Sequence, residues 1–329
     1  MMTEIRKRVP VLYLVVPCYN EEEVINQTAL VMKDKLSRLM AENKIAKNSK
    51  VLFVNDGSRD NTLNILYSLS KDNSIFGVLS FVANFGHQSA ILAGMMEARH
   101  HADVVVTIDA DLQQDIEALD LFLKAYMDGS EVVYGVRNDR SSDGFMKKLT
   151  ATMYYKLMHF LGSNTITNHA DYRLMSKKAL DALSEYEENS LFLRGLIPTM
   201  GFPSDIVYLD VKERAAGSSK YTFKKMMTLA IDGITSMSVR PIRIITGLGF
   251  VTVLSALALV IFTMIEWFRG NNIQGYTTTV LVTLIIGGVT ILSLGIIGEY
   301  VGKIYMETKK RPRYIVDTVV LKDTEDKEN

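Results

Sequence analysis

The feature that most constrains the fold of this chain is a short run of β-branched residues that stops in carboxylates, Val104 to Asp115. Such a run is typical of a strand buried on both faces, as in a sheet covered by helices. Asp109 and Asp111 then lie just past the carboxyl end of the strand, where open α/β sheets bind ligands. Because residues two apart in extended backbone point the same way, both carboxylates can converge on one divalent cation, with Gln113 as a further oxygen ligand. A strand followed by an acidic helix start is the alternative.

Strands alternate with helices through the first part of the sequence. The expected strands are 12–16, 51–54, 75–81, 104–108 and 131–136, with a later one at 206–211. This order predicts an α/β fold with a mostly parallel, Rossmann-like sheet covered on both faces. No Gly-x-Gly-x-x-Gly follows the first strand and no Walker sequence occurs, so a dinucleotide-binding or P-loop protein is disfavoured.

Composition narrows the class further. The 37 basic and 37 acidic residues balance, which gives no reason to expect a nucleic-acid partner. Cys18 is the single cysteine, which excludes an internal disulfide and a cysteine-based zinc site and fits a reducing compartment.

Two stretches without any charged residue, Ile244–Ile265 and Tyr276–Gly298, predict a hairpin of two membrane-spanning helices. Each exceeds the roughly 20 residues that a helix needs to cross a hydrocarbon core. Arg269 is the only basic residue between them, whereas basic residues cluster outside both, which places both ends in the cytoplasm. Buried helices of a soluble protein are the alternative. The flanking basic residues are Lys220, Lys224, Lys225, Arg240 and Arg243 before the hairpin, and Lys303, Lys309, Lys310, Arg311 and Arg313 after it.

The segment before the hairpin has apolar residues at helical spacing from Phe223 to Met237, which predicts a helix lying in the membrane interface. Packing against the soluble domain is the other interpretation. The expected organisation is a cytoplasmic domain (1–218), a juxtamembrane amphipathic helix (219–240), a transmembrane hairpin (241–305) and a cytoplasmic tail (306–329).

The polar motifs at the strand ends, taken in order, resemble family 2 glycosyltransferases of the GT-A fold. They are most similar to the polyprenyl-phosphate glycosyltransferases, which include dolichyl-phosphate mannose synthases and their bacterial undecaprenyl-phosphate relatives. The hairpin and Gly298–Gly302 resemble the bacterial branch. The matching motifs are Val16–Glu22, Asn55–Ser58, Asn84–Gly86, Asp109–Gln113, Asp171–Met175 and Gly217–Tyr221.

The resemblance implies an inverting transfer of one hexose from a UDP- or GDP-linked sugar to a polyprenyl phosphate, at the cytoplasmic face of the cell membrane and in the service of a wall or surface glycan. Mg²⁺ or Mn²⁺ bound by Asp109, Asp111 and Gln113 would stabilise the leaving diphosphate. The expected site residues are Pro17, Tyr19, Glu21, Asp56 and Asp109 for the nucleotide sugar, Asp111 and Asp171 for catalysis, and Arg137, Arg214 and Lys220 for the acceptor phosphate.

The role of Asp171 stays open between a general base and an orienting group, since a phosphate monoester with a second pKa near ~6 is already largely dianionic at pH 7. A processive synthase or a transferase with a hydroxyl acceptor is the second hypothesis. Processive relatives carry Gln-x-x-Arg-Trp, whereas this chain has Leu191-Phe192-Leu193-Arg194-Gly195. An inactive, partner-binding scaffold is a third hypothesis, and homo-oligomerisation stays open.

Overall fold

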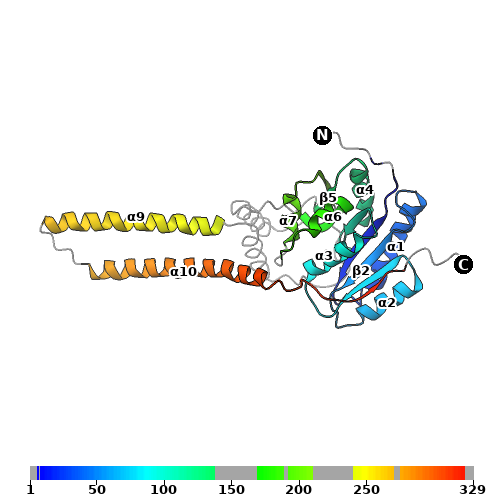
Figure 1. The fold of residues 1–329 in the computed structure, drawn as a ribbon, viewed down its shortest axis with the longest axis horizontal. Coiled ribbons are helices and arrows are strands. Elements are labelled where there is room, and N and C mark those ends of the chain that lie inside the picture. The colour runs from blue at the N-terminus through cyan, green and yellow to red at the C-terminus, as the bar shows by residue number, and fades with distance from the viewer. Residues whose placement is uncertain are drawn as a thin grey trace.

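The computed structural model describes residue 6 and residues 8–137, 169–188, 192–209, 240–269 and 275–322. These residues form an α/β domain and two long helices that extend away from it (Figure 1). The expected helix at 223–237 and the basic loop from Arg214 to Tyr221 lie outside the described residues.

An eight-stranded sheet with the order β7-β5-β6-β4-β1-β2-β3-β8 forms the centre of the domain. Strands β1, β2, β3 and β4 pair in parallel, as do β5 and β7, which confirms the predicted mostly parallel sheet. Strand β6 runs antiparallel between β4 and β5, and β8 runs antiparallel to β3. The strands are β1 (Leu12–Cys18), β2 (Lys50–Asn55), β3 (Phe76–Phe81), β4 (Val104–Thr107), β5 (Val132–Arg137), β6 (His169–Ser176), β7 (Ser204–Leu209) and β8 (Val316–Val320).

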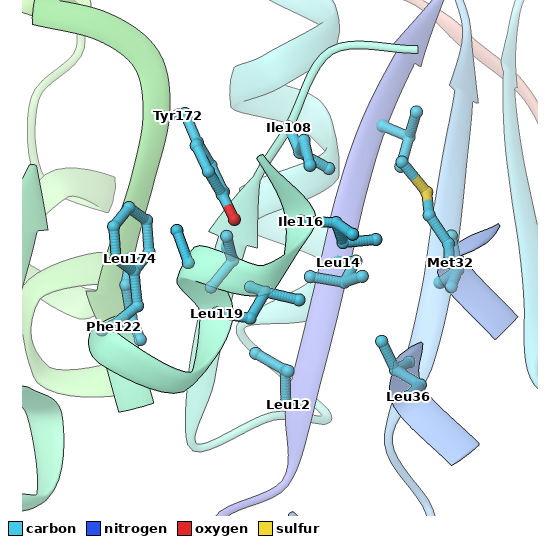
Figure 2. Close-up of a cluster of buried hydrophobic side chains, with 14 of the residues drawn as sticks. Leu12, Leu14, Met32, Leu36, Ile108, Ile116, Leu119, Phe122, Tyr172 and Leu174 are labelled. Carbon is cyan, nitrogen blue, oxygen red and sulfur yellow. The ribbon is translucent and has the colours of Figure 1, made fainter. Parts of the chain in front are cut away.

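Helices cover both faces of the sheet because successive strand residues point to opposite sides. On β1, Leu12 and Leu14 belong to one apolar cluster, which Figure 2 shows, and Tyr13 and Val15 belong to the other. The first cluster packs under α1 (Ile25–Ala41), α2 (Thr62–Asp72) and α4 (Leu119–Met127), with the short helix η1 (Ile116–Ala118). The second packs under α3 (His87–Ala98), α6 (Lys177–Ser184) and α7 (Leu193–Thr199).

Two strands were not predicted. The sequence does not predict strand β6, because Asp171 and Arg173 interrupt its apolar pattern, although both side chains are buried in the structure. Strand β8 lies within 306–329, which was predicted to be a tail, but the structure adds Val316–Val320 to the edge of the sheet. A short, half-exposed edge strand carries little local signal.

The helices α9 (Arg240–Phe268) and α10 (Tyr276–Thr308) lie alongside each other and extend away from the sheet (Figure 1). Their apolar side chains are largely exposed, among them Phe250, Leu254, Ile291 and Leu292. Within the residues that the structure describes, one helical stretch, Ile285–Thr308, is long and apolar enough to cross a membrane. This stretch overlaps the second predicted span, and the hairpin of two membrane-spanning helices stays a prediction.

Candidate active site

The candidate site lies where the adjacent parallel strands β2, β1 and β4 end. Hydrogen bonds from backbone N–H groups fix the loops there: the Asp56 N–H donates to the Cys18 carbonyl at 2.9 Å, and the Glu21 N–H donates to the Thr62 side-chain hydroxyl at 2.9 Å. The chain therefore presents the Asn20–Glu21 turn, Asp56 and the loop after β4 at one edge of the sheet, as predicted from the strand ends.

Asp56 organises the loop that follows β3. Its Oδ1 accepts the Phe85 N–H at 2.7 Å, and its Oδ2 accepts the Gly86 N–H at 2.9 Å and the Asn84 side-chain amide at 3.0 Å. Desolvation raises the pKa of Asp56, although the N–H groups of Phe85 and Gly86 oppose the shift. Gly57 has φ +63°, and a Cβ there would meet the Ala83 carbonyl carbon at 2.3 Å, so only glycine fits this close approach.

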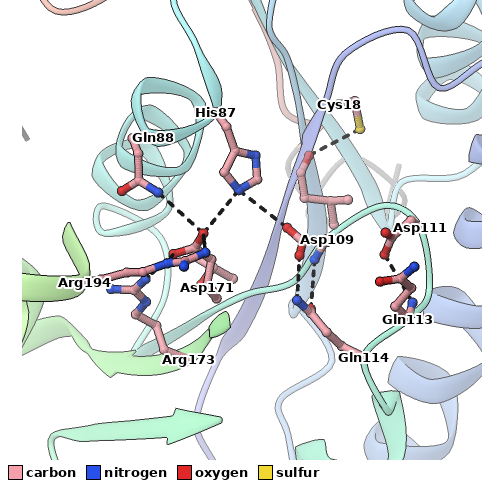
Figure 3. Close-up of polar contacts among 12 residues, drawn as sticks. Cys18, His87, Gln88, Asp109, Asp111, Gln113, Gln114, Asp171, Arg173 and Arg194 are labelled. Atoms are coloured by element: carbon pink, nitrogen blue, oxygen red, sulfur yellow. Dashed lines mark hydrogen bonds and ion pairs between the residues drawn. The ribbon is translucent and has the colours of Figure 1, made fainter. Parts of the chain in front are cut away.

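Asp109 is held in one orientation by Gln114. The Gln114 amide donates to Asp109 Oδ2 at 2.6 Å, and its oxygen accepts the Asp109 N–H at 3.0 Å (Figure 3). Desolvation raises the pKa of Asp109; His87 opposes this shift, whereas the negative charges of Asp171 and Asp111 add to it. A cation near this carboxylate would relieve that repulsion.

Asp111 and Gln113 lie on the loop that leads away from Asp109 (Figure 3). Leu112 between them has φ +54°, and Asp111 Oδ1 accepts the Gln113 N–H at 3.2 Å. Among the described residues, no group of three or more His, Cys, Asp or Glu side chains could hold a metal ion. The loop instead offers two carboxylates and an amide oxygen. This donor set suits Mg²⁺ or Mn²⁺ when substrate phosphates and water complete the coordination.

Asp171 on β6 is the most heavily paired carboxylate of the site. Its Oδ1 accepts Arg173 Nη2 at 2.7 Å and Arg194 Nε at 3.0 Å, and its Oδ2 accepts Arg194 Nη2 at 2.7 Å. Burial would raise the pKa of Asp171, but His87, Arg194 and Arg173 outweigh burial and hold it well below the ordinary value. The side chains of Asp171 and Arg173 are 4% and 0% exposed, whereas that of Arg194 is 41% exposed.

His87, at the start of α3, joins the two carboxylate groups. Its Nε2 lies 3.5 Å from Asp109 Oδ1 and 3.5 Å from Asp171 Oδ2 (Figure 3). Burial would lower the pKa of His87, but the two carboxylates outweigh it and the pKa is raised. The loop held by Asp56, the Asp109 loop and the Asp171 cluster thus form one continuous polar site.

The structure therefore gathers Asp56, Asp109 and Asp171 into one connected network, with Asp111 and Gln113 on the adjoining loop. Tyr19 is partly exposed just beyond β1, and Pro17 lies within that strand. Arg137 ends β5, and Arg214 and Lys220 lie outside the described residues. Sequence reasoning assigned no role to a further set of residues in the network: His87, Gln88, Gln114, Arg173 and Arg194.

A signal for part of this set was present in the sequence. Asp171 and Arg173 are two apart on one strand, so their side chains share a face and can pair. His87 and Gln88 extend the polar motif that begins at Asn84. Arg194 aligns with the arginine of the Gln-x-x-Arg-Trp signature of processive relatives, whereas the glutamine and tryptophan of that signature are absent from this chain.

The chain is a glycosyltransferase: it belongs to glycosyl transferase family 2, whose sequence model matches residues 13–184. The predicted family resemblance is confirmed. A second model, described as the GtrB C-terminal hairpin, matches residues 240–304, which include α9 and most of α10.

Three relatives illustrate the similarity. A Bacillus subtilis (strain 168) protein described as the uncharacterized glycosyltransferase YkoT is 45% identical over 94% of this chain and 91% of its own length. The prophage bactoprenol glucosyl transferase homolog of Escherichia coli (strain K12) is 36% identical over 93% of this chain and 98% of its own length. The bactoprenol glucosyl transferase of Shigella phage SfX is 38% identical over 92% of this chain and 97% of its own length.

Proposed function

We propose that this enzyme transfers a single hexose from a UDP- or GDP-linked sugar to a polyprenyl phosphate, with inversion and with a divalent metal, at the cytoplasmic face of the membrane. The proposal rests on one observation. The domain that contains the carboxylate site is followed in the same chain by two helices whose apolar side chains are exposed. Exposed apolar surface of this extent needs a lipid environment, and a polyprenyl chain needs the same environment. The names of the Escherichia coli and phage relatives, which match over the hairpin as well, support this acceptor class.

On the donor side, Asp109, Asp111 and Gln113 would hold the metal ion. The ion would neutralise the charge that gathers on the nucleoside diphosphate as the glycosidic bond breaks. Gln114 fixes the Asp109 carboxylate in advance through its paired hydrogen bonds, and preorganisation of this kind costs no rearrangement during the reaction. Asp56 holds the loop around Phe85 beside the nucleotide. The nucleotide also contacts Pro17, Tyr19 and Glu21.

Asp171 acts by position rather than as a base. A carboxylate that accepts bonds from two arginines and whose pKa lies well below the ordinary value is a weak proton acceptor. A dianionic phosphate acceptor has no proton to lose, so it needs no base. Asp171 instead orients Arg194 and His87 beside Asp109.

The same pairing favours a single displacement. The two arginines neutralise the buried Asp171 carboxylate, which makes it a poor nucleophile toward the sugar. An oxygen of the acceptor phosphate therefore attacks the anomeric carbon directly. The bond to the diphosphate breaks with its electron pair leaving on the nucleotide, and the configuration inverts.

The transmembrane arrangement yields a labelling prediction. Asn272→Cys is expected to react with an impermeant maleimide added outside intact cells, because the hairpin turn faces outward if both spans are present. Ser68→Cys, on the exposed face of α2, should react only after the cells are opened. Native Cys18 contributes no background, because it is buried and desolvation raises the pKa of its thiol. Labelling of Ser68→Cys but not Asn272→Cys from outside would refute the orientation.

The predicted acceptor-phosphate residues yield a kinetic prediction. Arg214→Ala and Lys220→Ala should raise the KM for polyprenyl phosphate far more than the Kd for the nucleotide sugar. The arginine change should be the more damaging, because a guanidinium can bind a phosphate through two aligned hydrogen bonds. Arg137→Ala belongs to the same test. Steady-state kinetics with each substrate varied in turn, with donor binding measured by calorimetry, checks this. Loss of donor binding with an unchanged acceptor KM would assign these residues to the diphosphate instead.

The choice of acceptor separates the proposal from a transferase with a hydroxyl acceptor. The enzyme in lipid is incubated with the nucleotide sugar that it binds and either polyprenyl phosphate, the unphosphorylated polyprenol or a diacylglycerol. Transfer to the phosphate alone is expected, since the pKa of Asp171 is held well below its ordinary value and makes this carboxylate a weak base for a hydroxyl. Efficient transfer to either alcohol would refute the proposal.

A further inference from the structure

The segment that follows α10 returns to the catalytic domain and contacts the loop that Asp56 holds. Figure 1 shows the chain passing from the end of α10 back to the sheet, where β8 pairs with β3. The Val82 N–H donates to the Ile315 carbonyl at 3.2 Å, just beyond the end of β3. The segment therefore lies beside the connection between β3 and α3, which carries Asn84–Gly86.

Aromatic rings connect this segment to the donor loop. The Tyr314 ring stacks on the Phe81 ring with centroids 5.2 Å apart and an angle of 13° between the ring planes. Phe81 contacts Phe85 edge to face at 5.7 Å, and the Phe85 N–H donates to Asp56 Oδ1 at 2.7 Å. Tyr314 is thus two ring contacts and one hydrogen bond away from the Asp56 carboxylate.

Further contacts hold the segment at both ends. The Arg313 guanidinium donates to the carbonyl of Tyr186, which follows α6. At the other end the Lys322 ammonium donates to the Lys71 carbonyl at 2.8 Å. Between them the Leu321 side chain occupies the space that a Cβ on Gly77 would fill, 2.4 Å from that position. These contacts attach both ends of the segment to the α/β domain.

We infer that residues 313–322 form a strap that keeps the donor loop in its binding conformation, with Tyr314 as a positioning residue for the nucleotide sugar. The inference rests on the proposed function, in which Asp56 and its loop bind the donor. Because the strap emerges directly from α10, it also couples the membrane hairpin to the donor site. The nucleotide should then bind best when the chain after the hairpin is seated on β3.

The test measures binding of UDP and of GDP, each with Mg²⁺, to the full-length protein in lipid, using the nucleotide that the wild type binds. Tyr314→Ala should weaken binding roughly three- to tenfold, the range expected when one stacked aromatic pair is lost. The same change should raise the donor KM with little change in kcat or in the acceptor KM. Tyr314→Phe, which keeps the ring, should bind like the wild type. The matched control is Asp317→Asn on the exposed face of β8, which should bind normally.

An unchanged Kd in folded Tyr314→Ala would overturn the inference, as would equal weakening in Tyr314→Phe. If Tyr314→Ala does not fold, hydrogen exchange in the wild type decides: adding nucleotide should slow amide exchange in residues 314–320 as well as in 84–86. Protection confined to 84–86 would contradict the coupling. Asp56→Asn separates the two proposals, because normal nucleotide binding in that variant would refute the donor-site assignment itself.

Discussion

Asp111→Asn is expected to lower kcat by roughly 10²- to 10³-fold, the loss typical when one electrostatic stabiliser of a transition state is removed. The substitution keeps the shape of the side chain and its acceptance of the Gln113 N–H. It removes one of the two carboxylates that would bind the metal. The fold should be unaffected, because Asp111 is only half-buried and an asparagine oxygen can accept the same Gln113 N–H. Initial rates at saturating donor, with the melting temperature as a check of folding, measure the effect.

Asp115→Asn is the matched control for this prediction. Asp115 lies on the same loop, but its carboxylate caps η1 by accepting the Glu117 N–H, and asparagine can cap equally well. The control should keep near wild-type activity and should bind Mn²⁺ in calorimetry, whereas Asp111→Asn should lose that binding. Full activity of the wild type in excess chelator would contradict metal dependence and the assigned role of Asp111.

Asp171→Asn is expected to destabilise the fold by about 3–5 kcal/mol, the usual cost of leaving a buried charge without its partner. The Arg173 guanidinium would remain buried without its carboxylate, and its Nε already lacks a hydrogen-bond partner among the described residues. Activity should fall as well, because Arg194 and His87 lose the group that orients them. Chemical denaturation measures the first effect and initial rates measure the second.

A double variant separates the two effects. Asp171→Asn combined with Arg173→Met also removes the unpaired guanidinium charge and should recover much of the stability. Apolar replacements of buried ion pairs often leave the stability unchanged or raise it. Activity should stay low. Asp181→Asn is the control, since its half-exposed pairs with Lys177 and Arg99 contribute little. A melting temperature of Asp171→Asn equal to that of the wild type would contradict the buried-pair account.

The pH dependence of stability follows from the same carboxylate. The pKa of Asp171 is lower in the folded protein than in the unfolded chain, where it is about 3.9. Between the two pKa values the folded state therefore binds fewer protons than the unfolded chain. The stability that Asp171 contributes is fully present above the pKa of the unfolded chain. It is lost as the pH falls through the folded pKa. Asp171→Asn should lack this acid-dependent loss.

The strand-end motifs were predictable because their signals are local. A β-branched run that stops at Asp109, or a strand that stops at Asp56-Gly57, marks the end of a buried parallel strand, and parallel strands bring such ends together. The Asp171–Arg173–Arg194 cluster was not predicted, because Arg194 lies 23 residues from Asp171 in the sequence and only the fold brings the two side chains together. For the same reason β8 was missed: its pairing with β3 joins segments that lie before and after α9 and α10 in the sequence.

The most direct test of the central claim is mass spectrometry of the lipid product. The purified full-length enzyme in lipid is supplied with Mg²⁺, excess nucleotide sugar and undecaprenyl phosphate until the reaction stops. The predicted product is the acceptor lipid carrying one hexose in a linkage of inverted configuration relative to the donor, with no longer species. A ladder of lipids with several hexoses, or sugar incorporated without any change in the polyprenyl phosphate, would contradict the account.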